Sequence, residues 1–297
     1  MHTPRVSILI PTMNGEEDLD RLLPALKAQH VAGGFEIVAL DSESDDGTRA
    51  LLSEAGVRFE TIKRADFAHG SARNRLGDLA RGEILVFLSQ DALPVGNRFV
   101  EELTAPLAEV GVAGTWARNL PHPTDDALTM RSLLSSGESD GVSRRVGLEA
   151  GVCLADLKPL DRMLRTRFNN VASAMSRETL QKQPFPIVPF GEDSAWAASV
   201  LGSGLQLQYV AEAVVLHAHR YDPKSAYKRN ELDARFMREV HGWIARPHLL
   251  SVLKGWLYEM REDARFLRER GGPWREALRA PMLRLGQVLG QWQGSRR

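Results

Sequence analysis

Cysteine is nearly absent from this sequence, since Cys153 is the single cysteine among 297 residues. One cysteine excludes both an internal disulfide and a cysteine-based metal cluster. We expect Cys153 to be a small buried side chain, which is the usual role of an isolated cysteine. The fold must therefore be held by its hydrophobic core, for which 43% of the residues are available.

Long apolar runs and an excess of charge are also missing. No run approaches the roughly 20 apolar residues that span a bilayer, and residues 6–11 are too short for the apolar part of a signal peptide. The 38 basic residues equal the 38 acidic ones, so no overall charge favours nucleic acid as a partner. We therefore expect a cytoplasmic protein that binds no nucleic acid.

Apolar runs at residues 6–10, 35–40, 57–62 and 84–88 predict strands, with helical patterns between them. This alternation predicts an α/β fold with a mostly parallel sheet covered by helices. No Gly-x-Gly-x-x-Gly follows the first strand and no Walker loop occurs, which disfavours a dinucleotide or P-loop site. Ligands of open α/β sheets bind at the carboxyl ends of the strands, and Asp41 and Asp91 follow two of these ends.

The rest of the chain is less regular until its last quarter. Residues 121–164 predict loops and short helices that face a substrate, and 205–216 predict two short strands. Beyond Pro223 the pattern is helical, so we expect a main domain over 1–222 and a helical extension over 223–297.

The extension has an apolar face and a basic bias. From Arg246 onward 11 basic residues stand against five acidic ones. One interpretation is packing against the main domain or a second subunit, and the other is an amphipathic helix on a membrane surface. The predicted face consists of Leu249, Leu253, Trp256, Leu257, Met260, Ala264 and Leu267.

Six short motifs follow one another in an order that resembles a known family. They are Ile10–Gly15 (IPTMNG), Asp41–Thr48 (DSESDDGT), Phe67–Asn74 (FAHGSARN), Phe87–Ala92 (FLSQDA), Phe190–Asp193 (FGED) and His217–His219 (HAH). Together they resemble the family 2 glycosyltransferases of the GT-A fold, and within that family the bacterial rhamnosyltransferase-like branch. The resemblance covers roughly residues 5–222 and leaves the helical extension outside.

The resemblance implies a Rossmann-like, mostly parallel sheet sandwiched by helices. It also implies inverting, metal-dependent transfer of a sugar, rhamnose among the candidates, from a dTDP-, UDP- or GDP-sugar. The acceptor would be a glycan or a lipid-linked glycan in the synthesis of cell-surface polysaccharide. The extension inherits nothing from this resemblance; from its own pattern we expect it to hold the enzyme at the inner face of the cell membrane or to form a homodimer.

The resemblance also implies residue roles at the donor site. Thr12 and Asn14 would contact the nucleoside, Asp41 the base or ribose, and His69 and Arg73 would lie at a helix start facing the diphosphate. The full set predicted to bind the donor is Pro11, Thr12, Asn14, Asp41, His69, Arg73 and Gln90.

A Mg²⁺ or Mn²⁺ ion would neutralise the diphosphate, with Asp91 as its oxygen ligand. Either His217 or His219 would be a second ligand, and His217, directly after a predicted strand, fits the family pattern better. Many members carry Asp-x-Asp where this chain has Ser89-Gln90-Asp91, which leaves the number of protein oxygens on the metal open.

Asp193 corresponds to the general base of the family, and Glu192 would orient it or contact the acceptor. Both acids also suit the first turn of a helix without any catalytic role. Trp196, one turn later, fits either stacking on an acceptor sugar or packing in the core.

Two other functions remain to be weighed. A sugar-1-phosphate nucleotidyltransferase would need a glycine-rich, basic loop after the first strand, which residues 11–14 do not provide. A catalytically silent GT-A module that binds a glycan or a partner is supported by Ser89 alone.

Overall fold

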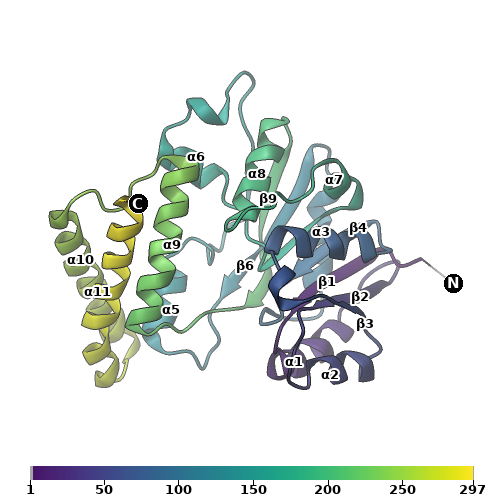
Figure 1. Cartoon of the computed structure of the whole chain (residues 1–297), viewed down its shortest axis with the longest axis horizontal. Helices are drawn as coiled ribbons and strands as arrows, with labels where there is room; N and C mark the ends of the chain where they lie inside the picture. The colour runs from purple at the N-terminus through teal and green to yellow at the C-terminus, as the bar shows by residue number, and fades with distance from the viewer. Residues whose placement is uncertain (1–2, 297) are drawn as a thin grey trace. The chain divides into compact units, whose positions relative to one another are not determined.

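The computed structural model describes residues 3–296, which form two compact units (Figure 1). The first unit comprises the chain up to Asn119 together with Asp140–Asp156 and Arg165–His217. The second comprises Leu120–Ser139, Leu157–Leu164 and the chain from Ala218 onward. The segment predicted to face a substrate, residues 121–164, is thus divided between the two units.

Within residues 3–296, nine strands form one sheet in the order β3-β2-β1-β4-β8-β6-β9-β5, with β7 paired to β9. The first four strands in this order are parallel, whereas β8 is antiparallel to both β4 and β6, and β9 to both β5 and β7. The predicted α/β class is confirmed. The sheet is mixed rather than mostly parallel, and its parallel half, β1 to β4, is the part that the alternation of strands and helices predicted. The strands are β1 (Val6–Thr12), β2 (Phe35–Asp41), β3 (Arg58–Thr61), β4 (Ile84–Leu88), β5 (Leu93–Pro94), β6 (Val112–Leu120), β7 (Arg144–Val146), β8 (Ala172–Ser176) and β9 (Gln206–Leu216).

Helices cover both faces of this sheet (Figure 1). Along β1, Ile8 and Ile10 join the core cluster that includes α1, and Leu9 between them joins the cluster that includes α3 and α8. This alternation follows from the period of two in a strand. The first unit contains α1 (Glu16–Lys27), α2 (Thr48–Glu54), α3 (His69–Leu79), α4 (Phe99–Thr104), α7 (Arg177–Lys182) and α8 (Glu192–Gly202), with 3₁₀ turns at Arg64–Asp66, Ala105–Ala108 and Leu154–Asp156.

Trp196 settles one of the open alternatives. Its side chain is fully buried in the core of the first unit, and its indole Nε1 donates to the carbonyl of Gln183 at 2.8 Å. It is a core residue that fixes the loop before α8, so stacking on a sugar is excluded in this conformation.

Two local predictions were wrong. Residues 206–216 form one strand rather than two. Glu212 in its middle faces outward and accepts a hydrogen bond from Ser143 Oγ at 2.5 Å, so this charged residue does not interrupt the strand. Cys153 is exposed, not buried, because it lies in a turn where its N–H donates to Asp156 Oδ2 at 3.2 Å.

The second unit is helical, as predicted for the C-terminal part. Glycines at every fourth position let α11 lie directly on α9. A Cβ added to Gly286, Gly290 or Gly294 would lie no more than 2.2 Å from a carbonyl oxygen of α9. Within residues 3–296 no helix combines the length and the apolar character needed to cross a bilayer. The helices are α5 (Ala127–Leu134), α6 (Pro159–Arg165), α9 (Pro223–His241), α10 (Leu249–Arg270) and α11 (Trp274–Arg296).

Candidate active site

The loops after β1 and β2 are bound to each other by side-chain hydrogen bonds. Asp41 is fully buried and accepts hydrogen bonds from Thr12 Oγ1 at 3.3 Å and from the Ser44 amide at 3.0 Å. Ser44 Oγ in turn accepts from the Asn14 amide, and Asn14 Oδ1 accepts from the Asp45 amide. These bonds hold Asn14 at a φ of 48°, an uncommon conformation for a residue other than glycine. The structure therefore brings Thr12 and Asp41 together inside the protein, and only Asn14 of these three predicted donor contacts is exposed.

Gln90 ties the tip of β4 to the same loop. Its Oε1 accepts from the Met13 amide at 2.9 Å, and its Nε2 donates to the Met13 carbonyl at 3.2 Å. A Cβ at Gly15 would lie 2.6 Å from Gln90 Oε1, so glycine is needed there for this close approach. Pro11, the other predicted donor contact of this loop, is half-buried within β1. Gln90 thus positions the loop that follows β1.

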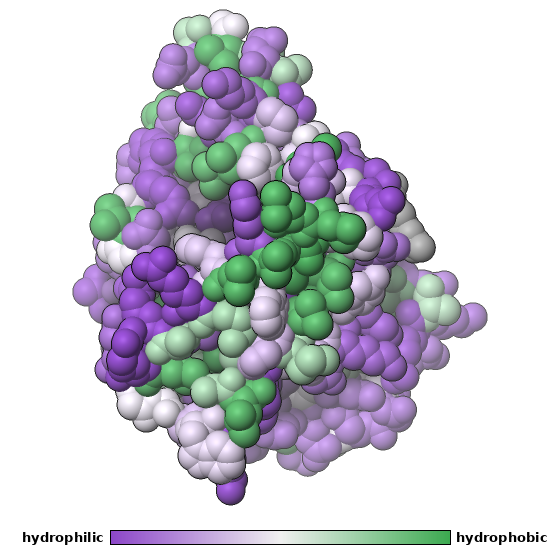
Figure 2. Space-filling view, turned by 90° about the vertical axis from the view of Figure 1, so that its left-hand side faces the viewer, coloured by the Kyte–Doolittle hydropathy of each residue, from purple (hydrophilic) through white to green (hydrophobic). Residues whose placement is uncertain are grey.

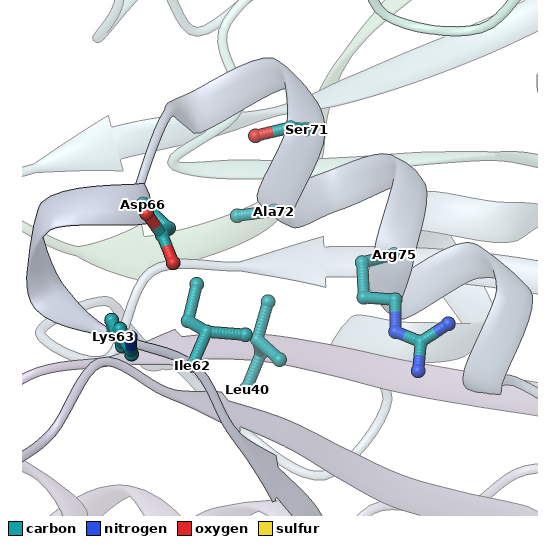
Figure 3. A pocket seen from close by; sticks show the side chains of 7 residues that line it. All are labelled: Leu40, Ile62, Lys63, Asp66, Ser71, Ala72 and Arg75. Carbon is teal, nitrogen blue, oxygen red and sulfur yellow. The ribbon is translucent and has the colours of Figure 1, made fainter.

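A cavity of about 250 Å³ opens beside the ends of β2 and β3 (Figure 3). Leu40 and Ile62 form its apolar floor, and Ile62 also donates its amide to the carbonyl of Asp41 at 2.8 Å. The cavity is therefore next to the buried loop network. Its other lining residues, none of them predicted from the sequence, are Lys63, Asp66, Ser71, Ala72 and Arg75.

The two predicted diphosphate contacts on α3 differ in their surroundings. His69 is exposed at the first position of α3, with its ring edge-on to Phe67 at 5.0 Å between centroids. Arg73, one turn later, is buried, and its Nη1 donates to Glu192 Oε1 at 2.6 Å and its Nη2 to the Asn170 carbonyl at 3.5 Å. The guanidinium of Arg73 is thus directed to the acids of α8.

Arg73 keeps its charge in this position. Burial lowers the pKa of Arg73, and the neighbouring charges of Glu192 and Asp193 raise it again. An arginine starts from so high a pKa that it remains protonated in proteins. A permanent positive charge therefore lies next to both acids.

Asp193 lies in the first turn of α8, after Gly191, whose φ of 76° sets the turn into the helix. Its Oδ1 accepts the Ser194 amide at 2.7 Å. Burial, followed by the negative charge of Glu192, raises the pKa of Asp193 to about 7, against the opposing effect of the Ser194 amide and of Arg73. A carboxyl group with such a pKa is half ionised near neutral pH, which is the property of a good general base.

Asp91 and His217 are brought together from the ends of β4 and β9. His217 Nε2 lies 3.4 Å from Asp91 Oδ2, and the two side chains are 11% and 33% exposed. Burial and then the negative charge of Asp91 raise the pKa of Asp18 on α1, against the opposing effect of Arg21. The carboxylate oxygen of Asp91 and the imidazole nitrogen of His217 fit a divalent cation that keeps positions for phosphate oxygens and water.

His219 lies two residues after His217, in the second unit. Its role as a metal ligand stays a prediction from the sequence.

Several residues of this site escaped prediction. Asn170, just before β8, donates its Nδ2 to Glu192 Oε1 at 3.4 Å and is held by Ser173, yet no sequence pattern marks it. Asn74 clamps the loop before α8 through two hydrogen bonds to the backbone of Phe185, both of 2.9 Å. Asn74 is the last residue of the FAHGSARN motif, in which only His69 and Arg73 were predicted to have a role, so the motif could have pointed to it.

Comparisons with known proteins place this geometry in context. The model of the family described as glycosyl transferase family 2 matches residues 7–165. The chain is 26% identical to the O-antigen chain rhamnosyltransferase RfbN of Salmonella typhimurium, over 97% of this chain and 90% of that one.

Two solved structures share the fold. A mannosyltransferase from Pyrobaculum calidifontis, in complex with GDP-Man and Mn²⁺, has a TM-score of 0.56 at 18% identity, over 96% of this chain and 70% of that one. The glucosyl-3-phosphoglycerate synthase of Mycobacterium tuberculosis, in complex with Mn²⁺, UDP-Glc and phosphoglyceric acid, has a TM-score of 0.52 at 20% identity, over 80% of both chains. These likenesses confirm the predicted GT-A fold.

Proposed function

Because the chain belongs to glycosyl transferase family 2, it is a glycosyltransferase, and we propose that it transfers a sugar from a nucleotide-diphosphate donor with inversion at the anomeric carbon. The near full-length likeness to a rhamnosyltransferase of the O-antigen chain makes rhamnose the first sugar to test. The same likeness supports a growing polysaccharide chain as the acceptor.

The position of Asp193 carries this proposal: it lies in the first turn of α8, directly after Glu192, whose carboxylate is bound by Arg73, and its pKa is raised to about 7. In an inverting transfer, the acceptor hydroxyl forms a bond to the anomeric carbon while the bond to the diphosphate oxygen breaks. The proton of the hydroxyl must pass to a base, and the nucleoside diphosphate leaves with the bonding electrons. Asp193, ionised above about pH 7, is the group that accepts this proton.

Glu192 and Arg73 act on Asp193 rather than on the sugar. Glu192 is 6% exposed and its Oε1 is already bound by Arg73. Its negative charge disfavours a second charge on Asp193, which keeps the pKa of Asp193 high, while Arg73 limits that effect. The pair sets the basicity of Asp193 and holds α8 against α3.

Asp91 and His217 would hold a divalent cation, with His219 as a further candidate. When bound, Mg²⁺ or Mn²⁺ would stabilise the negative charge of the departing diphosphate. No acid is then required of the protein for the leaving group, which agrees with a single base at Asp193.

The nucleotide base would occupy the cavity on Leu40 and Ile62. A flat apolar floor with a polar rim is the usual combination in a small-molecule site. Asn14 and His69 are exposed near the neighbouring strand and helix ends, where they remain the candidates for ribose and phosphate contacts.

Calorimetric titration of dTDP, UDP and GDP, each with and without Mn²⁺, tests this function. We expect one of the three to bind tightly and only with the metal, and Asp91→Asn to lose at least tenfold in that affinity. Asp20→Asn, which changes an exposed acid on α1, is the matched control and should bind as the unchanged protein does. If none of the three binds to the folded protein, the alternative of a catalytically silent GT-A module is favoured. Equal binding with and without the metal would refute the metal site.

A further inference from the structure

The outer face of α10 and α11 carries a continuous group of large apolar side chains (Figure 2). Every member is at least 51% exposed. Trp256 Nε1 of α10 donates to the Pro281 carbonyl of α11 at 2.9 Å, which joins the helices so that their outer rows adjoin. We call this group the apolar patch: Leu249, Leu250, Leu253, Leu257, Trp274, Leu278 and Met282.

The predicted apolar face of α10 is in fact divided. Trp256, Met260 and Leu267 are turned inward, whereas Leu249, Leu253 and Leu257 are exposed. Packing within the second unit therefore explains only half of the apolar side chains of this helix.

Most acidic side chains of the two helices have partners inside the second unit. Asp263 is buried and binds Arg284 through two contacts of 2.8 Å, and it also binds Arg131 of α5 at 2.5 Å. Glu259 pairs with Arg131 as well, and Glu276 accepts a backbone N–H of α5 at 3.0 Å. Three of the five acidic residues after Arg246 thus bind partners inside the second unit.

Basic side chains line one edge of the patch. Lys254, Arg261 and Arg268 recur every seven residues, which places them on one side of α10, next to the row of leucines. All three are exposed, and within residues 3–296 they form no ion pair. Arg275 stands over the ring of Trp274 at 5.8 Å, at the patch itself.

We propose that the apolar patch docks on an anionic lipid bilayer, with α10 and α11 lying in the plane of its surface. The leucines, Trp274 and Met282 would enter the boundary between headgroups and acyl chains, and Lys254, Arg261 and Arg268 would contact lipid phosphates. The long stems of these basic side chains allow their charges to reach the headgroups beside a buried apolar row.

Charge complementarity favours a bilayer over a second copy of the chain. A two-fold interface brings the same patch against itself. The exposed edge offers basic groups. Of the five acids after Arg246, three are bound inside the unit and Glu262 pairs with Arg265 of its own helix, so most of the acids that could pair with this edge across such an interface already have partners. An anionic surface supplies the missing negative charge.

Flotation of the full chain with lipid vesicles tests this proposal without nucleotide or acceptor, so its outcome does not depend on the proposed transferase chemistry. We expect binding to vesicles of phosphatidylcholine with phosphatidylglycerol, much weaker binding to phosphatidylcholine alone, and release at high salt. Light scattering after size exclusion on the same samples reports the oligomeric state.

Two pairs of substitutions separate the apolar and the basic contributions. Leu257→Glu with Leu278→Glu should abolish vesicle binding, and Val110→Glu, a fully exposed apolar position outside the patch, should not. Lys254→Ala and Arg261→Ala should each weaken binding about fivefold, and Lys27→Ala on α1 should leave it unchanged.

Retention of binding by the Leu257→Glu, Leu278→Glu protein would overturn the proposal, as would equal binding to both kinds of vesicle. A dimer that binds no vesicles and dissociates on the same double substitution would also overturn it, and would assign the patch to a second copy.

Discussion

Arg73 and Glu192 form a buried ion pair across 119 residues of sequence, with 2.6 Å between Nη1 and Oε1 and side chains 7% and 8% exposed. The pair joins α3 to α8 and places a fixed positive charge beside the acids of α8. A Cβ at Gly70 would lie 2.3 Å from the Pro186 carbonyl, so α3 and the loop before α8 approach as closely as a glycine permits. Stability and catalysis therefore share this contact.

Removal of the arginine should be strongly destabilising. Arg73→Ala leaves Glu192 buried without its partner, which typically lowers the free energy of unfolding by about 3–5 kcal/mol. Arg98→Ala breaks an exposed pair with Glu101 and should change stability little. Urea denaturation of the two variants measures the difference, and equal midpoints would show that the buried pair has no special role.

Activity should depend on pH through Asp193. The value of kcat/KM should rise with pH and reach half of its plateau near pH 7, because the base must be ionised. In Glu192→Gln a neighbouring negative charge is removed while Arg73 remains, so the pKa of Asp193 should fall and the acid limb should move to lower pH. Glu178→Gln, at an exposed acid of α7, is the control. An acid limb that stays in place in Glu192→Gln would contradict the assigned coupling.

Asp193 should also reduce stability at high pH. Its pKa is raised in the folded protein, so the folded state binds the proton more tightly than the unfolded state, and stability falls as pH rises from about 4 to 7. Asp193→Asn lacks this titration and should therefore unfold at a higher temperature than the unchanged protein at pH 8. The difference should shrink towards pH 4. Thermal unfolding across this range measures it, and a difference independent of pH would count against the raised pKa.

Gln90 and Gly15 should act as one unit at the donor site. Gln90→Ala removes both bonds to Met13, and Gly15→Ala forces Gln90 aside because its Cβ would lie 2.6 Å from Oε1. Each variant should weaken nucleotide binding, and the double variant should be no weaker than the worse single one, giving a coupling of about 0.5–3 kcal/mol. Titration with the preferred diphosphate tests this; additive losses would mean that the two positions act separately.

The sequence predicted the fold where local patterns decide it. The strands from Val6 to Leu88 and the helices between them follow from runs of apolar residues and their spacing, and the helical tail does likewise. Pairing partners beyond β4 are set by contacts far apart in the chain, and no period in the sequence reports them. This is why the antiparallel half of the sheet was missed.

The site shows the same limit. The motifs made Asp91, Asp193 and His217 candidates, because each follows or precedes a recognisable strand or helix end. They did not show that Thr12 and Asp41 bind each other, or that Arg73 is directed to Glu192, since a motif records positions but not the direction of a side chain. Asn170 carried no signal at all, because its contact with Glu192 forms only in the folded chain.

The role of Asp193 as the base is tested most directly by the rate of sugar transfer by Asp193→Asn, with binding of the nucleotide measured on the same preparation. The asparagine keeps an oxygen that can accept the Ser194 amide but cannot take the proton of the acceptor. We expect a loss of about 10²- to 10⁴-fold in kcat with unchanged affinity for the nucleotide. A rate within tenfold of the unchanged protein would show that Asp193 is not the base.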